Sequence, residues 1–334
     1  MKAVIVRNFV PFDQAEICNV PDPVPGPGEV VVAVRNADVN FPDILVIEGN
    51  YQIKPPLPFS PGKAGAGVVE TVGAGVVDLR PGDRVSFQVE YGAYAEKVLV
   101  PARNCRPMPD HISFEQATAL GLVYQTAFFA LVDHARMQPE DSVLVLGASG
   151  GVGMASVQLA KALGAGLVIG ATRGDDKSAS VRRYGADHVL DLSTENLRDA
   201  LRHEVKGQTG GVGVDIVIDP VGGAATSAAL RALAWRGRMV IVGFASGEIP
   251  SISAGYLLVK NISVSGIQWS DYRQRDPDRV GQVQKKLFEL FSSGAIAPHV
   301  SRLYPLEDYA QALAQLKAGS GEGKIILAVG PAHP

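Results

Sequence analysis

The chain has 334 residues, of which 46% are hydrophobic and 19% are charged. This composition supplies enough apolar side chains for large buried cores, so it excludes a disordered or fibrous chain. The 31 Lys and Arg residues against 34 Asp and Glu give a formal net charge of −3, without the basic surplus of nucleic-acid-binding proteins. At roughly 100–200 residues per domain, the length predicts two or three domains.

The two cysteines, Cys18 and Cys105, are too few for a disulfide framework or a four-cysteine zinc lobe. The N-terminus reaches a charged residue, Arg7, after only four apolar residues, which does not predict a signal peptide. Glycines interrupt the uncharged stretch 142–160, so it predicts a strand, a turn and a helix rather than a membrane span. We therefore expect a soluble, cytoplasmic protein with no nucleic-acid or membrane partner.

The first third of the chain consists of short β-type runs separated by turns that contain glycine and proline. One such turn, PDPVPGPGE, precedes the run 30–34, and Pro81-Gly82-Asp83 is a second turn signal. This pattern predicts a small antiparallel β domain, in the form of a partly open barrel. The expected strands are 3–6, 30–34, 67–72, 84–87 and 95–100.

From Ser113 the pattern becomes helical, and from Asp141 it alternates between strands and helices. Ser113 is the expected N-cap of a helical segment that runs to residue 135. Parallel strands need crossover helices, so the alternation predicts a doubly wound α/β domain. Its expected strands are 142–146, 166–172, 187–192, 214–219 and 238–244, and its expected helices are 153–163, 178–184, 196–205 and 224–235.

The tail loses this alternation. We expect a strand over 261–267, helices over 280–292 and 306–317, and a last strand over 323–329. We therefore assign the tail to the first domain. The predicted division is 1–123 and 267–334 for one domain and 124–266 for the other.

A glycine-rich turn, Gly147-Ala148-Ser149-Gly150-Gly151-Val152-Gly153, links the first strand of the alternating region to its helix. Glycine permits a tight turn and lets backbone N–H groups approach a pyrophosphate at the helix N-terminus. A plain strand–helix turn is the alternative. The surrounding alternation favours a dinucleotide site that includes Ser149, Gly150, Gly151 and Val152.

The end of the second strand indicates which dinucleotide binds. An NAD site places an acidic residue there, for the ribose 2′-hydroxyl; this chain has Thr172 and Arg173, with Lys177 close behind. The two cations suit a 2′-phosphate and favour NADP(H). Alternatively the two cations are solvated residues at a helix start. Asp175 and Asp176 also lie nearby, and we expect them to occupy the first turn of that helix.

Many short motifs, in order along nearly the whole chain, resemble the zinc-independent branch of the medium-chain dehydrogenase/reductase superfamily, and specifically its NADPH:quinone oxidoreductase (zeta-crystallin-like) family. They are Asn40-Phe41-Pro42-Asp43, LPFSPG (57–62), GAGVVETVGAGV, PGDRV, GAYAE, YQTA (124–127), LGASGGVGMASVQLAKALGA, GVDIVIDPVGG, VGFASGEIP and LLVKNISVSGIQW.

This resemblance implies a GroES-like catalytic domain, the partly open barrel, built from both ends of the chain, with a Rossmann-type cofactor domain inserted between them. It implies a nicotinamide near Asn40, Tyr124, Thr126, Phe244 and Ala245, in the cleft between the domains. It also implies a homodimer, or a tetramer built from dimers, often through an edge strand that corresponds to NISVSGI.

Zinc-dependent relatives carry a Gly-His-Glu stretch after a proline, whereas this chain reads Pro61-Gly62-Lys63-Ala64. The six histidines show no ligand-type spacing. We therefore expect no metal. Leu45 and Ile47 replace a tyrosine and an arginine that many quinone reductases carry, and Ala64 or Lys63 replaces the usual acid, so the choice of substrate stays open.

Without a metal to polarise a carbonyl, alcohol oxidation is difficult, whereas hydride addition to a conjugated acceptor spreads the new charge. The candidate catalytic residues are Asn40, Tyr51 and Tyr124, each with a plain alternative: a turn residue, surface packing and core packing, respectively. Asp43 is expected to cap a short helix rather than act in catalysis. Asp219 and Pro220 end a parallel strand, where ligands collect in such folds, and a plain turn is the alternative.

The first hypothesis is an NADPH:quinone oxidoreductase that works on a small-molecule quinone. The second is an NADPH-dependent reductase of enones, alkenals or enoyl-thioesters. A third is an NADPH-binding sensor with little turnover, which the replacements at Leu45, Ile47 and Ala64 favour.

Overall fold

The computed structural model describes residues 1–174, 176–319 and 321–330. The strands are β1 Lys2–Ile5, β2 Glu16–Asn19, β3 Glu29–Asp38, β4 Ala64–Val72, β5 Arg84–Gln88, β6 Lys97–Pro101, β7 Cys105–Pro107, β8 Ser142–Leu146, β9 Leu167–Thr172, β10 His188–Asp191, β11 Val214–Asp219, β12 Leu233–Ile241, β13 Ser263–Gly266, β14 Val300–Pro305 and β15 Lys324–Ala328. The helices are α1 Phe41–Ile47, α2 Phe114–Ala119, α3 Leu122–Phe128, α4 Gly151–Ala162, α5 Ser178–Arg183, α6 Leu197–Gln208, α7 Gly223–Ala229, α8 Ala254–Lys260, α9 Trp269–Arg275, α10 Pro277–Ser292 and α11 Tyr309–Lys317.

The chain forms two compact units. The first comprises Met1–Leu122, Ser270–Phe288 and Pro298–Pro334, and the second comprises Val123–Trp269 and Glu289–Ala297. Residues 289–297 thus group with the second unit, although the sequence analysis assigned the whole tail to the first domain. No helix in the described part of the chain is long and apolar enough to cross a membrane.

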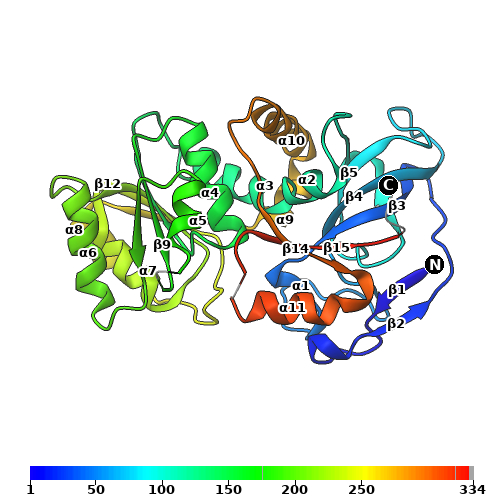
Figure 1. Cartoon of the computed structure of the whole chain (residues 1–334), viewed down its shortest axis with the longest axis horizontal. Helices are drawn as coiled ribbons and strands as arrows, with labels where there is room; N and C mark the ends of the chain where they lie inside the picture. The colour runs from blue at the N-terminus through cyan, green and yellow to red at the C-terminus, as the bar shows by residue number, and fades with distance from the viewer. Residues whose placement is uncertain (175, 320, 331–334) are drawn as a thin grey trace. The chain divides into compact units, whose positions relative to one another are not determined.

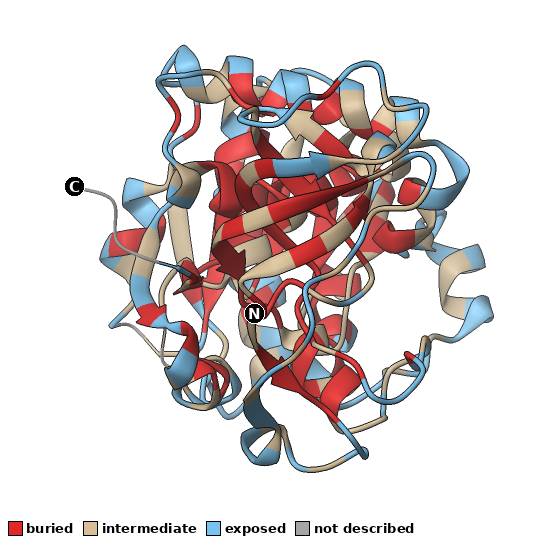
Figure 2. Cartoon of the chain, turned by 90° about the vertical axis from the view of Figure 1, so that its right-hand side faces the viewer, coloured by how far each residue is buried: buried red, intermediate tan, exposed pale blue. Residues whose placement is uncertain are grey.

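The first unit is built on a seven-stranded sheet in the order β14-β15-β3-β4-β5-β7, with β6 also paired to β3. All pairs are antiparallel except β14 with β15. The last strand joins the sheet through Ile326 opposite Asp38, and in Figure 1 the red end of the chain runs beside the blue β3. Buried residues follow these strands (Figure 2), and their side chains form one core with α1 and α11.

The second unit contains a six-stranded parallel sheet in the order β10-β9-β8-β11-β12-β13. Successive residues of β8, Val143 to Leu146, are all buried. Because side chains alternate between the two faces of a strand, both faces of the sheet are covered, as in doubly wound folds. The strand order reverses between β8 and β11, and ligands of such sheets bind at the carboxyl edge near that point.

Local sequence signals set several element ends, and tertiary pairing overrides others. Ser113 caps α2 as expected, because its Oγ accepts from the N–H of Gln116 at 3.1 Å. The predicted long helix after it divides at Gly121 into α2 and α3. The prediction of a helix over 224–235 was wrong at its end, because the chain enters β12 at Leu233 and pairs there with Val214 of β11.

Two hydrogen bonds to the Asp43 carboxylate hold the start of helix α1 in the core of the first unit. The N–H of Asn40 donates to Asp43 Oδ2 at 2.8 Å, and the hydroxyl of Tyr94 donates to the same oxygen at 3.0 Å. Asp43 is 1% exposed. Burial raises its pKa to about 7, against the opposing hydrogen bond from Asn40 and the charge of Lys63.

We expect Asp43→Asn to flatten the pH dependence of stability. The native carboxyl keeps its proton up to about pH 7, whereas an unfolded one ionises near 3.8, so the wild-type protein loses stability as the pH rises between these values. Between pH 5 and pH 8 the free energy of unfolding should shift in favour of the variant by about 2–3 kcal/mol. Urea unfolding at several pH values measures this shift.

Asp78→Asn, at an exposed aspartate of the same unit, is the control and should run parallel to the wild type. A constant difference between Asp43→Asn and wild type across this pH range would contradict the raised pKa.

Candidate functional site

The glycine turn after β8 brings the start of α4 against the strand end. Gly147 has a φ of +60°, and the N–H of Gly150 donates to the carbonyl of Gly147 at 3.0 Å. A Cβ on Gly153 would lie 2.0 Å from the Gly147 oxygen, so only glycine allows this approach. The first-turn N–H groups of α4, including those of Gly151 and Val152, have no partner within the helix and suit an anion.

The carboxyl ends of the parallel strands are aligned at this edge. Leu146 of β8 is opposite Ala171 of β9, and Asp219 of β11 is opposite Ile241 of β12. The glycine turn and the loops after β9, β11 and β12 therefore leave the same edge of the sheet. This geometry, in which a helix N-terminus follows a glycine cradle at the reversal of strand order, fits a dinucleotide.

The loop after β9 presents Arg173 to solvent and ties down its neighbours. Thr172 is buried, and its hydroxyl donates to the carbonyl of Gly174 at 2.9 Å. The N–H of Gly174 donates to Asp191 Oδ1 at 2.9 Å. The hydrogen bonds that Asp191 accepts from Ser193 and Gly174 lower its pKa. Sequence reasoning missed this anchor, because the pairing of Asp191 with Thr172 becomes apparent only in the sheet.

Lys177 precedes α5 and is half-buried, while Arg173 is exposed. The expectation that the two acids occupy the first turn of this helix was wrong for Asp176, because α5 begins at Ser178. Asp175 lies outside the described residues.

The loops after β11 and β12 are joined by main-chain hydrogen bonds. Asp219 is fully buried, and its Oδ1 accepts from the N–H groups of Val221 and Gly222 at 2.9 Å each. Ala245 donates its N–H to the carbonyl of Pro220 at 3.1 Å. Asp219 thus holds a turn, the plain alternative of the sequence analysis, while the adjacent loop carries the half-buried Phe244 and the exposed Ala245.

Tyr124 and Thr126 are buried on α3. The hydroxyl of Tyr124 donates to Gln158 Oε1 at 2.7 Å, and burial raises the pKa of the phenol. Gln158 in turn accepts from the N–H of Ala297 at 2.8 Å. This network supports core packing for Tyr124 more strongly than proton donation to a substrate.

Asn40 lies in the first unit, between β3 and α1, and is 4% exposed. Its Oδ1 accepts from the ammonium of Lys324 at 2.9 Å, and the same ammonium lies 2.5 Å from Asp38 Oδ1. Its Nδ2 is buried without a hydrogen bond of regular geometry in the described residues. Buried amides normally have partners, so Asn40 is a donor suited to a ligand oxygen.

Tyr51 and Lys63 lie together in the same unit. The ammonium of Lys63 is 4.6 Å from the centroid of the Tyr51 ring, and it donates to the carbonyl of Glu90 at 3.0 Å. It also pairs with the Glu90 carboxylate, which binds Arg273 as well. Tyr51 itself is half-buried.

The residues around Lys63 do not fit a zinc site. Lys63, in the stretch where zinc-dependent relatives have Gly-His-Glu, is 4% exposed and carries its own ion pair. Within residues 1–174, 176–319 and 321–330, no three His, Cys, Asp or Glu side chains are grouped to hold a metal ion. Of the replaced family positions, Ile47 and Ala64 are buried in the first unit, and Leu45 is half-buried.

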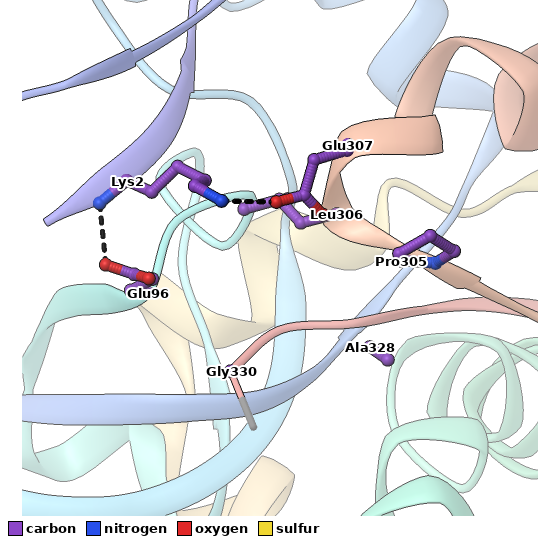
Figure 3. Close-up of a pocket in the computed structure, with 7 residues that line it drawn as sticks. All are labelled: Lys2, Glu96, Pro305, Leu306, Glu307, Ala328 and Gly330. Carbon is purple, nitrogen blue, oxygen red and sulfur yellow. Dashed lines mark hydrogen bonds and ion pairs between the residues drawn. The ribbon is translucent and has the colours of Figure 1, made fainter. Parts of the chain in front are cut away.

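A hollow of about 310 Å³ in the first unit is lined by residues other than those predicted for the site. In Figure 3 the backbone N–H of Lys2 donates to Glu96 and its ammonium reaches Glu307, at 2.6 and 2.5 Å. Exposed ion pairs of this kind contribute little to stability, and we assign no chemistry to this hollow. Its lining residues are Lys2, Glu96, Pro305, Leu306, Glu307, Ala328 and Gly330.

Comparison with known proteins identifies relatives over nearly the whole chain. The family model described as alcohol dehydrogenase GroES-like domain matches residues 26–110, and the one described as zinc-binding dehydrogenase matches residues 151–285. A quinone oxidoreductase-like protein 2 homolog from Nematostella vectensis is 38% identical over 304 residues, which cover 90% of this chain and 82% of that protein.

Two similar solved structures are complexes with NADPH. The quinone oxidoreductase of Escherichia coli is 30% identical, with a TM-score of 0.90 over 98% of this chain and 100% of its own. A mycobacterial protein is 32% identical, with a TM-score of 0.91 over 98% and 99% of the two chains. The expected fold, a GroES-like domain with a Rossmann-type domain, is confirmed. The chain belongs to the medium-chain dehydrogenase/reductase superfamily and, within it, to the NADPH:quinone oxidoreductase-like family.

Proposed function

We propose that this protein is a metal-independent oxidoreductase that reduces a small quinone with NADPH. The observation that carries the proposal is the glycine turn at the reversal of the parallel sheet, where Gly153 lets the start of α4 approach β8. The NADPH complexes of the two similar structures support the same choice of cofactor.

The residues of the second unit would hold the dinucleotide. Ser149, Gly150, Gly151 and Val152 offer backbone N–H groups for the pyrophosphate. Arg173 and Lys177 offer positive charge for the 2′-phosphate. Thr172 shapes the loop, and Thr126, Phe244 and Ala245 are proposed nicotinamide contacts.

When bound, NADPH supplies a hydride, whose electron pair comes to rest on a carbonyl oxygen of the acceptor as a hydroquinone anion or an enolate. Asn40 would donate Nδ2–H to that oxygen or to the cofactor carboxamide, and Tyr51 is a second proposed donor. Neutral donors suffice because the charge is spread over a conjugated system. The anion then takes its proton from solvent.

Oxidation of NADPH, followed by its near-ultraviolet absorbance, tests this function with an ortho-quinone, a para-quinone and a simple enone in parallel. We expect turnover with quinones that a chelator does not change. Turnover with the enone alone would instead support a double-bond reductase, and tight NADPH binding without any turnover would support a sensor.

We expect Arg173→Ala/Lys177→Ala to weaken NADPH binding about 10- to 100-fold, because charge-assisted hydrogen bonds contribute about 1.5–3 kcal/mol, and to weaken NADH binding much less. Cofactor fluorescence titration measures both affinities. The matched control, Arg202→Ala/Lys206→Ala on α6, removes the same two residue types from the same unit. An equal loss for both cofactors would contradict this position of the 2′-phosphate.

We also propose a homodimer that forms through β13. This strand is at the edge of the parallel sheet in the described part of the chain, and the preceding helix exposes Leu258 and Val259 by 79% and 74%. Edge strands and exposed apolar side chains are common association surfaces.

Leu258→Asp/Val259→Asp should therefore yield monomers in size-exclusion chromatography with light scattering. Val24→Asp/Val77→Asp, at exposed apolar residues of the first unit, is the control and should remain dimeric. A dimer that persists in the first variant would show that α8 is outside the interface.

A further inference from the structure

Lys324 and Asp38 form a buried ion pair that stability alone does not explain. Lys324, at the start of β15, is 3% exposed, Asp38, at the end of β3, is fully buried, and 2.5 Å separates Nζ from Oδ1. Apolar side chains of similar size often match or exceed the stability that a buried pair provides. The pair therefore calls for a role beyond holding two strands together.

The ammonium of Lys324 has three donors, and each has a partner. They are Asp38 Oδ1, the carbonyl of Val39 at 2.9 Å and Asn40 Oδ1 at 2.9 Å. An ammonium can only donate, so the amide atom that faces it must be the oxygen. Lys324 thereby fixes both the backbone before Asn40 and the orientation of its amide.

The nitrogen of the Asn40 amide, Nδ2, is then the donor. Asn40 Nδ2 is buried and makes no hydrogen bond of regular geometry in the described structure, although its amide interacts with the Asp38 carboxylate. Burial raises the pKa of Asp38. The charge and hydrogen bond of Lys324 oppose that rise, and a weaker hydrogen bond from the Asn40 amide opposes it further. An amide nitrogen carries two N–H groups, so an interaction with Asp38 involves at most one, and the second is left for a ligand.

We propose that Lys324, compensated by Asp38, is a positioning residue that holds Asn40 Nδ2–H toward a carbonyl oxygen. This inference rests on the proposed function and deepens it. The ligand atom is a carbonyl oxygen, which belongs either to the electron acceptor or to the carboxamide of the cofactor. Lys324 touches neither and acts through Asn40.

A double-mutant cycle separates this role from a structural one. Asp38→Leu/Lys324→Met removes both charges together, so no unpaired charge stays buried, and Asn40→Ala removes the donor. We expect either change to lower kcat/KM about 10-fold or more. Their combination should be no slower than Asn40→Ala alone, because residues that act through one another are not additive.

If the losses in kcat/KM of the two changes multiply in the combined variant, the ion pair acts independently of Asn40, and the proposal is overturned. Melting temperatures of all variants monitor folding. Asp141→Asn/Arg238→Met is the matched control, since it removes a partly buried pair of 2.8 Å from the second unit. We expect this control to change kcat/KM by the same factor in the wild-type background and in the Asn40→Ala background.

A second readout does not depend on turnover. Selective ¹⁵N labelling of asparagine side chains, with Asn40→Ala for assignment, reports the environment of the Asn40 amide. We expect its resonances to shift toward solvent-averaged values in Asp38→Leu/Lys324→Met, and unchanged resonances would overturn the proposal. This measurement remains valid even if no quinone or enone is reduced, so it distinguishes failure of the inference from failure of the proposed function.

The same spectra, with NADPH Kd values, identify the source of the carbonyl oxygen. A shift of the Asn40 amide on addition of NADPH, with weaker NADPH binding in Asn40→Ala, indicates the carboxamide. A shift that requires a quinone, with unchanged NADPH binding, indicates the acceptor. An Asn40 amide that responds to neither would overturn the proposal.

Discussion

The second unit depends on one close approach, that of Gly153 to the carbonyl of Gly147. A Cβ at residue 153 would lie 2.0 Å from that oxygen, so any other residue would push α4 away from the end of β8. The N-terminus of the helix would then no longer face the edge where the other strand ends are aligned. A steric requirement at one backbone atom thus decides whether the fold presents an anion site at all.

The first unit has a different constraint, because it buries charges. Asp38, Asp43, Lys63 and Lys324 are each less than 5% exposed, and isolated charges at such places would be costly. The fold compensates them locally: Lys324 pairs with Asp38 and Lys63 with Glu90, while Asp43 accepts hydrogen bonds from Asn40 and Tyr94 and keeps its proton up to about pH 7. Asp43 and the Lys324–Asp38 pair lie at the start of α1, so these polar groups and the proposed donor Asn40 belong to one structure.

The periodicity of the sequence predicted the parallel sheet because each of its strands is a short apolar run followed by a helix that must cover it. The glycine turn was predictable for the same local reason. Leu233 was assigned to a helix instead, because the residues before it favour helix and its pairing with Val214 is a long-range contact. Local propensity cannot represent such a contact.

The candidate site was less predictable than the fold. Asn40 and Asp43 are recognisable as a cap from their spacing, but Lys324 is 284 residues from Asn40, and only the antiparallel pairing of β15 with β3 brings it there. Lys63 is similar: its position in the Pro-Gly stretch shows that a metal ligand is missing, while its pairing with Glu90 and Arg273 depends on the folded unit. Spacing reveals which residue types are available, and the sheet decides which of them meet.

These compensated charges also bear on the chemistry. Because Lys63 and Lys324 are both committed to carboxylates, neither ammonium is a free positive charge of the kind a metal ion provides. An alkoxide concentrates its charge on one oxygen and needs such a strong electrophile. A hydroquinone anion or enolate spreads its charge, so a neutral N–H held at a fixed angle is sufficient. Under the proposed function, the Lys324–Asp38 pair buried beside Asn40 would therefore suit conjugated acceptors better than simple alcohols and aldehydes.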